Sequence, residues 1–397
     1  MSPLVTILLL ATVVAAGVYG MAVVATLWHT SSSPPPLPPG GAPPVSLLKP
    51  LKGLEEELRE NLQSVYRQDY PGALEVVFAV RDRADPALAV ARAVAAAHPE
   101  VPTRFVVSDP GFGLNPKVAN LEAALSAARH DLVLQTDANV RLRPDYLCRV
   151  VGELEGTGAH LLSSLVVGRG ERTVAAALNN VHLSSYIGPA TCFAIVYAGV
   201  VCVIGKSMLF RRSDLTAVGG LRLVSDVLAE DFILGRAFQR AGKRVVLSST
   251  AVENITIRSS VGAFVERQAR WLKMRAVIHV PAFLIDPLAN PVGLGAVAWL
   301  ASGLAPELAA PFLSLVVAKT ASDLVLLRRT RGEPLHVRFL WVPLLRDLWL
   351  LALWPWCAVS RSIDWRGQRR RLGPDSRLEP VAAASEVGER RRRLAWF

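Results

Sequence analysis

The sequence predicts an α/β domain held at a membrane by apolar helices near both ends of the chain. Hydrophobic residues make up 51% of the 397 positions, and the long uncharged runs lie at the N-terminus and in the last third. Between them, short β-rich runs alternate with helical patterns, which is typical of a largely parallel sheet covered by helices. The net charge is +11, and residues 328–397 hold 15 arginines against seven acidic residues. This basic flank beside apolar segments favours a membrane surface over nucleic acid as partner.

The first expected element is a transmembrane helix over residues 1–29. Leu4 to Trp28 carries no charge across 25 residues, which at a rise of 1.5 Å each exceeds a hydrocarbon core of about 30 Å. A cleaved signal peptide fits less well, because no basic region precedes the run and the run is too long. Residues 30–44 follow as a linker. Seven prolines between positions 34 and 44 exclude a helix there and predict a stiff, extended spacer.

The catalytic domain is expected over residues 45–275, where strands and helices alternate. Ligands of parallel sheets bind beyond the carboxyl ends of the strands, and Asp82 and Asp137 fall at two such ends. No glycine-rich dinucleotide or P-loop motif accompanies the strands, which disfavours those two enzyme classes. The expected strands are Val45–Leu48, Leu74–Val80, Arg104–Val107, Asp131–Gln135, Lys206–Arg211 and Val245–Ser248. The expected helices are 54–65, Pro86–Ala97, Pro116–Ala128, Leu228–Arg240 and Phe264–Arg275.

Membrane and interfacial helices are expected over residues 276–360, followed by a basic cytosolic tail over 361–397. Pro291–Leu304 and Pro311–Leu327 suit a helical hairpin, and Lys319 and Asp323 in the second run are spaced to pair on one helix face. The segment Phe339–Val359 is apolar apart from Arg346 and Asp347, which we expect near an interface or inside a bundle. A full crossing by this segment would place one arginine cluster outside, so we expect a re-entrant or interfacial segment.

The topology expected from the basic flanks is an outer N-terminus and a cytosolic catalytic domain in a multi-pass membrane protein. The composition is compatible with a bacterial inner membrane. Ala190–Ile204 is another apolar run, which we interpret either as a buried element or as a lipid-facing wall. Its 15 residues are short for a crossing. His182, just upstream, is given no role.

Charged residues at four places in the domain share a chemical purpose. Singly they are ordinary, because aspartates cap turns, acidic residues favour helix starts, and arginines cover solvated faces. Together they fit transfer of a sugar from a nucleotide. That reaction needs a group for the nucleoside, positive charge for the diphosphate and a base for the acceptor hydroxyl. The four places are Asp82, Asp137, Glu230-Asp231 and Arg267-x-x-Arg270-Trp271.

In these and further stretches the chain resembles the ceramide glucosyltransferases, family 21 of the glycosyltransferases. The resemblance runs from about Val45 to Leu372 and implies a GT-A catalytic domain, with a Rossmann-like mixed sheet, between N- and C-terminal transmembrane helices. Leu114–Leu121 in particular favours this family over the processive families. The other stretches that carry the resemblance are Val45–Gly53, Asn61-Leu62, Asp69–Pro71, Asp82 with Asp85–Ala87, Asp137, Ala229–Phe232, Arg267–Trp271 and Trp365-Arg366.

The resemblance implies a role for each aspartate. Asp82 would bind the uracil or ribose of the donor. Asp137 would hold Mg²⁺ or Mn²⁺, since hard cations prefer oxygen ligands and phosphate oxygens can complete the shell. The sequence reads Thr136-Asp137-Ala138-Asn139 instead of Asp-x-Asp, so Asn139 offers only a neutral oxygen. Asp231 would be the general base for the acceptor hydroxyl, with Glu230 supporting the metal or the helix start.

Basic and aromatic residues complete the implied donor site. Arg267, Arg270 and Trp271 would bind the diphosphate and wall the acceptor tunnel, because the arginine fork bonds phosphate oxygens in pairs. Lys117 is a further candidate for the phosphates or the donor sugar. A solvated lysine at a helix start is the alternative interpretation of that residue.

These expectations combine into one function with three alternatives. The expected enzyme is an inverting hexosyltransferase that moves glucose from UDP-glucose to the primary hydroxyl of ceramide. The first alternative is a related transferase acting with another UDP-sugar on a hopanoid, diacylglycerol or polyprenyl phosphate. The second is a processive polysaccharide synthase, and the third is a non-catalytic membrane scaffold. Presence of all three aspartates and both arginines argues against the scaffold.

Overall fold

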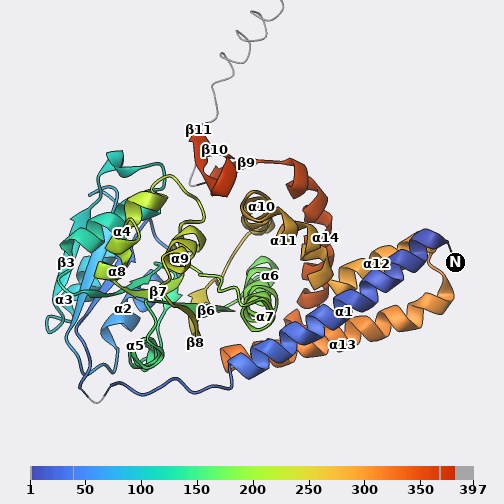
Figure 1. Ribbon diagram of the computed structural model, residues 1–397, viewed down its shortest axis with the longest axis horizontal. Coiled ribbons are helices and arrows are strands. Elements are labelled where there is room, and N and C mark those ends of the chain that lie inside the picture. Colours follow the sequence, from blue (N-terminus) through green and yellow to red (C-terminus); the bar gives the residue numbers. More distant parts are fainter. Residues whose placement is uncertain (1, 39, 366–367, 381–397) are drawn as a thin grey trace, which may run out of the picture.

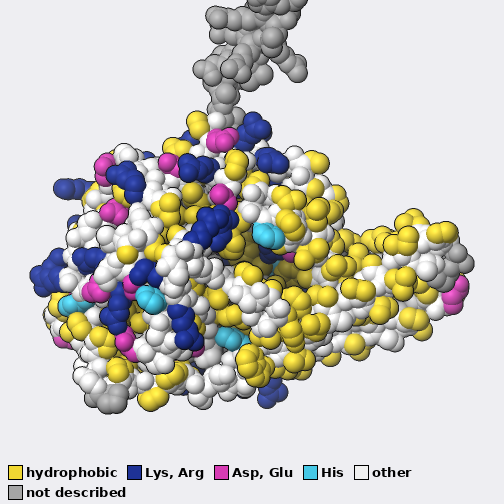
Figure 2. All heavy atoms as spheres, viewed as in Figure 1, with side chains coloured by type: hydrophobic (Ala, Val, Ile, Leu, Met, Phe, Trp, Pro, Cys, Tyr) yellow, Lys and Arg dark blue, Asp and Glu magenta, His cyan; other side chains and the backbone are white. Residues whose placement is uncertain are grey.

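The computed structural model describes residues 2–38, 40–365 and 368–380. A rounded α/β part carries the central sheet, and an arm that contains α1, α12 and α13 projects from one side of it (Figure 1). Hydrophobic atoms cover most of the visible surface of that arm, whereas charged side chains gather on the α/β part (Figure 2). The expected division into a catalytic domain over residues 45–275 and flanking membrane helices stays a prediction.

The α/β part is organised around an eight-stranded mixed sheet with the order β3-β2-β1-β4-β7-β6-β8-β5. The first four strands in this order run parallel, β7 is antiparallel to β4 and β6, and β6 and β8 are parallel. The strands are β1 Val45–Pro50, β2 Leu74–Val80, β3 Thr103–Val107, β4 Leu132–Thr136, β5 Val140–Arg141, β6 Leu161–Arg169, β7 Ser207–Arg211 and β8 Val245–Ile255.

Helices cover this sheet and bury its apolar side chains in two clusters. One cluster joins β1, β2 and β4 to α2, α3 and α5, and the other joins the opposite side of β1, β2 and β4 to α4 and α9. Side chains of a strand alternate between the two faces, so the apolar residues of β1 and β2 serve both clusters. The helices are α2 Leu58–Tyr66, α3 Pro86–Ala96, α4 Pro116–Ala127, α5 Tyr146–Thr157, α6 Val174–His182, α8 Arg212–Ala217, α9 Glu230–Arg240 and α10 Val261–Ile278.

Four helical segments are long and apolar enough to cross a membrane: Pro3–His29, Val174–Ala198, Pro306–Arg331 and Val337–Val359. The second contains the apolar run at 190–204 only in part, because α6, the π-helix Leu183–Ile187 (η2) and α7 Gly188–Ala198 form one continuous 25-residue segment. The sequence interpretation of 190–204 as too short for a crossing missed this extension upstream. The labels of the first and third segments are α1 Pro3–His29 and α13 Pro306–Arg331. The other helices of the last third are α11 Val280–Ile285, α12 Pro291–Ala301 and α14 Val342–Val359.

A buried ionic cluster joins all four of these segments. Lys319 Nζ lies 2.6 Å from Asp323 Oδ2 and 2.7 Å from Asp347 Oδ2, and Arg346 bonds both aspartates and Ser185 Oγ of η2. The four charged side chains are at most 3% exposed, and Tyr19 of α1 donates to Asp323. The expected i, i+4 pair in α13 is therefore present, and Arg346 and Asp347 lie inside the bundle. Two cations balance two anions, which reduces the cost of burying them.

After α14 the chain returns to the α/β part. The strands β9 Ser362–Trp365, β10 Gln368–Leu372 and β11 Leu378–Pro380 form a small antiparallel sheet where the sequence suggested only a basic tail. Ser376 accepts a hydrogen bond from Leu228 N at 3.0 Å through its carbonyl and from Ala229 N at 3.1 Å through its hydroxyl. This segment therefore packs beside the start of α9. Arg366 and the arginines at 390–393 lie outside the described residues.

Candidate active site

Two of the expected aspartates lie at the same edge of the sheet, because β1, β2 and β4 are parallel neighbours. Asp137 follows β4 directly, and Asp82 follows β2 with β1 in between. Asp82 is exposed, and its carboxylate accepts a hydrogen bond from Ala84 N at 2.9 Å within its own turn. Asp137 is instead drawn into a cluster of charged side chains. The structure thus places both at the predicted edge but brings only Asp137 into the charged cluster.

Lys117 is the centre of this charged cluster. Its Nζ lies 2.9 Å from Asp137 Oδ1 and 2.9 Å from Glu230 Oε1, and donates to the carbonyl of Gly205 at 3.0 Å. Burial alone would lower the pKa of Lys117, but the carboxylates of Asp137 and Glu230 raise it above its usual value. A half-solvated lysine at a helix start would lack these contacts. The ammonium is therefore fixed in the site, as the resemblance to the family implied.

The stretch Leu114–Leu121, which carries part of the family resemblance, holds Lys117 at the start of α4. Asn115 caps α4 by accepting from Lys117 N at 3.0 Å, and its amide donates to Val227 O at 2.7 Å. Pro116 stands at the first turn, where its missing N–H costs nothing. These contacts tie the start of α4 to the loop that leads into α9. Lys117 and Glu230 are brought together in this way although they are far apart in sequence.

Asp137 is bonded from both sides by lysines. Lys206 Nζ lies 3.0 Å from Asp137 Oδ2 and donates to Asn139 Oδ1 at 2.8 Å. Burial works against ionisation of Asp137, but Lys117 and Lys206 together hold its pKa well below the ordinary range. Asn139, the neutral replacement in the expected metal motif, therefore serves here as a partner for a lysine.

Asp231 stands at the N-terminus of α9, where backbone N–H groups surround its carboxylate. Gly205 N donates to Oδ2 at 2.5 Å and Phe232 N donates to Oδ1 at 2.8 Å. A Cβ atom on Gly205 would lie 2.9 Å from Asp231 Oδ2 and 3.1 Å from Lys117 Nζ, so only glycine allows this close approach. Burial and the neighbouring Glu230 carboxylate raise the pKa of Asp231 to about 6. Such a value suits a base that works near neutral pH.

The basic helix α10 brings Arg267 and Trp271 to the same edge. The Arg267 guanidinium lies 5.4 Å from the centre of the Trp271 ring, one turn further along the helix. Burial lowers the pKa of Arg267, while Asp137 and Glu55 act in the opposite direction, which shows that Arg267 lies within electrostatic range of the lysine cluster. Arg270 is half-buried on the same helix.

Two cationic residues of the site were missed by the sequence interpretation. Lys206 precedes β7 directly, and Lys49 is a fully buried lysine within β1. Lys49 Nζ donates to Val140 O at 3.0 Å and to Thr136 Oγ1 at 3.3 Å. Burial lowers the pKa of Lys49 to about 7, against the opposing effect of Asp137. The sequence feature that could have indicated Lys49 is a charged residue within a mostly apolar strand.

The donor set around Lys117 has the chemistry that Mg²⁺ and Mn²⁺ prefer, because all three of its neighbours are oxygens. Among residues 2–38, 40–365 and 368–380, however, no three His, Cys, Asp or Glu side chains converge on one point that could hold a metal ion. An ion at Asp137 would have to displace a lysine ammonium and take further oxygens from its ligand. The residues fit a cation that arrives with a diphosphate better than a resident structural metal.

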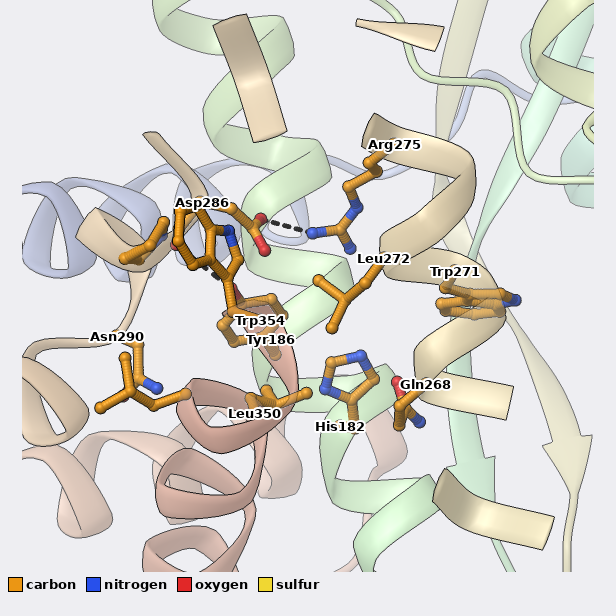
Figure 3. Close-up of a pocket in the computed structure, with 12 residues that line it drawn as sticks. His182, Tyr186, Gln268, Trp271, Leu272, Arg275, Asp286, Asn290, Leu350 and Trp354 are labelled. Atoms are coloured by element: carbon orange, nitrogen blue, oxygen red, sulfur yellow. Dashed lines mark hydrogen bonds and ion pairs between the residues drawn. The ribbon is translucent and has the colours of Figure 1, made fainter. Parts of the chain in front are cut away.

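A narrow pocket of about 380 Å³ opens where α10 meets the membrane-facing elements (Figure 3). Trp271 and Arg275 line it from α10, and Leu350 and Trp354 from α14. Trp271 lines this pocket and also stacks with Arg267, so α10 links the pocket to the basic residues of the site. The remaining lining residues are His182, Tyr186, Gln268, Leu272, Asp286, Pro287, Asn290 and Leu351.

The chain is similar in sequence to curated ceramide glucosyltransferases. Ceramide glucosyltransferase 1 of Caenorhabditis elegans is 27% identical over 255 residues, covering 64% of this chain and 54% of the relative. The ceramide glucosyltransferase of Komagataella phaffii is 26% identical over 299 residues, covering 61% and 58%. The chain therefore matches between half and two thirds of the length of these relatives.

Solved structures with a similar fold include a mannosyltransferase from Pyrobaculum calidifontis in complex with GDP-Man and Mn²⁺. It is 20% identical, with a TM-score of 0.45 and coverage of 86% of this chain and 98% of that chain. TarS of S. aureus in complex with UDP-GlcNAc is 13% identical, with a TM-score of 0.39 and coverage of 86% and 100%. The family model described as Glycosyl transferase family 21 matches residues 8–378. With nearly its whole described length matched, and a mixed sheet of the GT-A type, the chain belongs to glycosyltransferase family 21.

Proposed function

We propose that this protein is a membrane-bound inverting glycosyltransferase that moves glucose from UDP-glucose to the primary hydroxyl of ceramide. The observation that carries the proposal is the position of Asp231. Its buried carboxylate has a raised pKa and stands at the start of α9 beside Glu230 and the lysine cluster, which is suited to a diphosphate. The pocket between α10 and α14 would admit the acceptor. The names of the curated relatives support ceramide and glucose as the substrates.

The donor would bind along the carboxyl edge of the sheet. Asp82, exposed at the end of β2, would accept hydrogen bonds from the uracil or ribose. Lys117, Lys206 and Arg267 would face the diphosphate, with Arg270 and Trp271 beside them on α10. Lys117, Lys206 and Arg267 are three cations beside the three carboxylates of the cluster. The pKa of Lys49 is about 7, so this amine can take up a proton when an anionic ligand binds. The basic groups therefore favour an anionic ligand such as a diphosphate.

A divalent cation, Mg²⁺ or Mn²⁺, would be held by Asp137, with Glu230 and Asn139 nearby. When bound, it supplies positive charge opposite the diphosphate as negative charge develops on the leaving group. Because Lys117 and Lys206 already bond Asp137, the ion and its phosphate ligands would take over contacts that the ammonium groups make in this structure.

The reaction would be a single displacement at the anomeric carbon. The acceptor oxygen forms a bond to that carbon while the bond to the diphosphate oxygen breaks, and UDP leaves with the electron pair. Asp231 takes the proton of the hydroxyl, and attack from the face opposite the leaving group gives a β-linkage. The lysines and Arg267 stabilise the charge on the departing diphosphate. Positioning and charge stabilisation would supply most of the rate.

The membrane arrangement follows from where the helix ends lie. Arg329 at the end of α13 donates to Thr30 O at 2.8 Å, so the ends of α1 and α13 share one side with the α/β part. The arginines there favour the cytosol for that side. The segment Val337–Val359, which includes α14, has both ends beside α10. At its start Phe339 packs with Phe264, and just beyond its end Ser362 O accepts a hydrogen bond from Lys273 at 2.7 Å. We therefore propose that this segment is interfacial or re-entrant.

A donor-by-acceptor matrix tests the proposal. Membranes containing the protein are incubated with UDP-glucose, UDP-galactose or UDP-N-acetylglucosamine, each against ceramide, diacylglycerol, a hopanoid and polyprenyl phosphate. Mass analysis of the lipid then identifies the product. We expect a single hexose on ceramide from UDP-glucose. Transfer to another lipid alone would replace the acceptor assignment, long products would indicate a processive synthase, and no transfer with any pair would favour a scaffold.

A further inference from the structure

His182 is a buried polar residue to which the reaction above assigns no part. It ends α6, is 2% exposed, and lines the pocket between α10 and α14 (Figure 3). Its ring stacks on Tyr186, with centres 5.0 Å apart, and lies 6.3 Å from the ring of Trp271. Its Nδ1 is buried and has no hydrogen-bond partner among the described residues. Buried polar atoms are almost always hydrogen-bonded, so this atom calls for a ligand.

Other polar groups around the pocket already have partners. Arg275 forms an ion pair with Asp286, and the hydroxyl of Tyr186 donates to Asp286 O at 3.4 Å. Asn290 donates to the carbonyl of Asp347 at 2.7 Å, and Trp354 Nε1 donates to Phe283 O at 3.0 Å. Arg275 and Asp286 balance each other's charge, and among the described residues that line the pocket His182 Nδ1 is the buried polar atom without a partner. A neutral lipid head with a hydrogen-bonding group fits it better than a phosphate.

We infer that His182 Nδ1 forms a hydrogen bond with the amide group of the acceptor lipid and so selects ceramide over diacylglycerol. The inference rests on the proposed function, because it names how that site recognises its acceptor. The amide N–H of ceramide can donate to Nδ1 when the imidazole carries its own proton on Nε2. Diacylglycerol has ester oxygens at the corresponding place and no N–H. Nδ1 is shielded from solvent, so the lipid must part the side chains that line the pocket.

Two substitutions separate the hydrogen bond from the packing. His182→Phe keeps a flat ring against Tyr186 but removes the nitrogen, whereas His182→Asn keeps a polar atom near the position of Nδ1. His98→Phe is the matched control, because His98 also stacks on a tyrosine, Tyr66, at 4.9 Å on the far side of the α/β part. None of these positions contacts the charged cluster in the described residues.

The experiment measures kcat and KM for ceramide and diacylglycerol with each variant in membranes or detergent. We expect His182→Phe to raise KM for ceramide about 10-fold, the effect of one lost hydrogen bond, with kcat and the KM for the UDP-sugar within about twofold. His182→Asn should restore most of the loss, and His98→Phe should resemble the parent. The parent protein should also prefer ceramide to N-methyl ceramide about 10-fold, and His182→Phe should not.

The outcomes separate this inference from the function on which it rests. An unchanged KM for ceramide in His182→Phe, or an equal loss with diacylglycerol, would show that His182 only packs. If His182→Phe does not fold, the comparison of ceramide with N-methyl ceramide in the parent decides. If the parent transfers sugar to no lipid, the proposed function fails. Binding of short-chain ceramide to the parent and to His182→Phe, measured by tryptophan fluorescence, then tests the role of His182 separately. The inference is overturned if the parent does not bind ceramide or if both proteins bind it equally.

Discussion

Substitution of Asp231 by asparagine tests the chemistry at the centre of the site. The amide cannot take the proton of the acceptor hydroxyl, so we expect kcat to fall by roughly 10²–10⁴-fold, the usual contribution of a general base. The donor site is built by Lys117, Asp137 and Arg267, which remain. Binding of UDP-glucose, measured by titration calorimetry on the purified protein, should therefore change by less than about threefold, a difference of under 1 kcal/mol.

The raised pKa of Asp231 gives the same residue a signature in the parent protein. A carboxyl of pKa about 6 is about nine-tenths ionised at pH 7 and about one-tenth ionised at pH 5. We expect kcat/KM to fall about tenfold per pH unit below pH 6, because only the ionised form can act as a base. Asp231→Asn should lose this acidic limb along with its activity.

Stability has to be followed as a control, because Asp231 accepts two backbone hydrogen bonds and asparagine can accept at only one oxygen. The raised pKa also means that the folded state favours protonated Asp231, so ionisation above pH 6 costs stability that the neutral asparagine does not lose. Thermal unfolding should therefore change little. Asp214→Asn removes a carboxylate paired with Lys243 away from the site and should keep full activity. Transfer by Asp231→Asn at more than a tenth of the parent rate would remove the general-base assignment.

Three further predictions concern the cation cluster and the membrane helices. Lys117→Met should weaken UDP-sugar binding about 10–100-fold in calorimetry, because a charged hydrogen-bonding group is lost from the site; unchanged affinity would exclude contact with the donor. Removal of divalent ions with EDTA should abolish transfer, with recovery on adding Mn²⁺ or Mg²⁺, whereas full activity after chelation would refute a metal at Asp137. Asp347→Asn should destabilise the protein by about 3–5 kcal/mol in detergent, because it breaks a buried ion pair. The exposed Asp364→Asn serves as its control, and equal unfolding midpoints would show that the cluster is dispensable.

Local patterns in the sequence were sufficient for most of the elements. A β-rich run marked β2 at its observed bounds, an alanine-rich run marked α3, and proline at the first helical turn marked α4. The uncharged run near the N-terminus marked α1 because its length exceeds a bilayer core. These features depend on contacts within one segment. The strands β5 and β6 and the helix α5 were missed, and β5 has only two residues, too few to show a pattern.

The chemistry of the site was also readable in part from the chain. Aspartates at strand ends and a basic helix indicated an anionic ligand at one edge of the sheet, and the structure places Asp137, Asp231 and Arg267 there. The sequence could not show that Lys206 and Lys49 face Asp137, because β7 and β1 are aligned with β4 only by sheet pairing. The sequence also could not show that Asp137 joins the charged cluster and Asp82 does not, because each aspartate simply follows a strand.

What the sequence by itself determined is therefore local: where helices and strands form, which segments are apolar enough for a membrane, and which residue types could handle a nucleotide sugar. Only the tertiary structure decided which of those residues meet. The Asp231 carboxylate gains its raised pKa from burial and from Glu230, and its place against Gly205 from a loop 26 residues away in sequence. The unpartnered nitrogen of His182 likewise exists only because α6, α10 and α14 close around it. Burial and long-range pairing are properties of the packed chain, and no short stretch of sequence contains them.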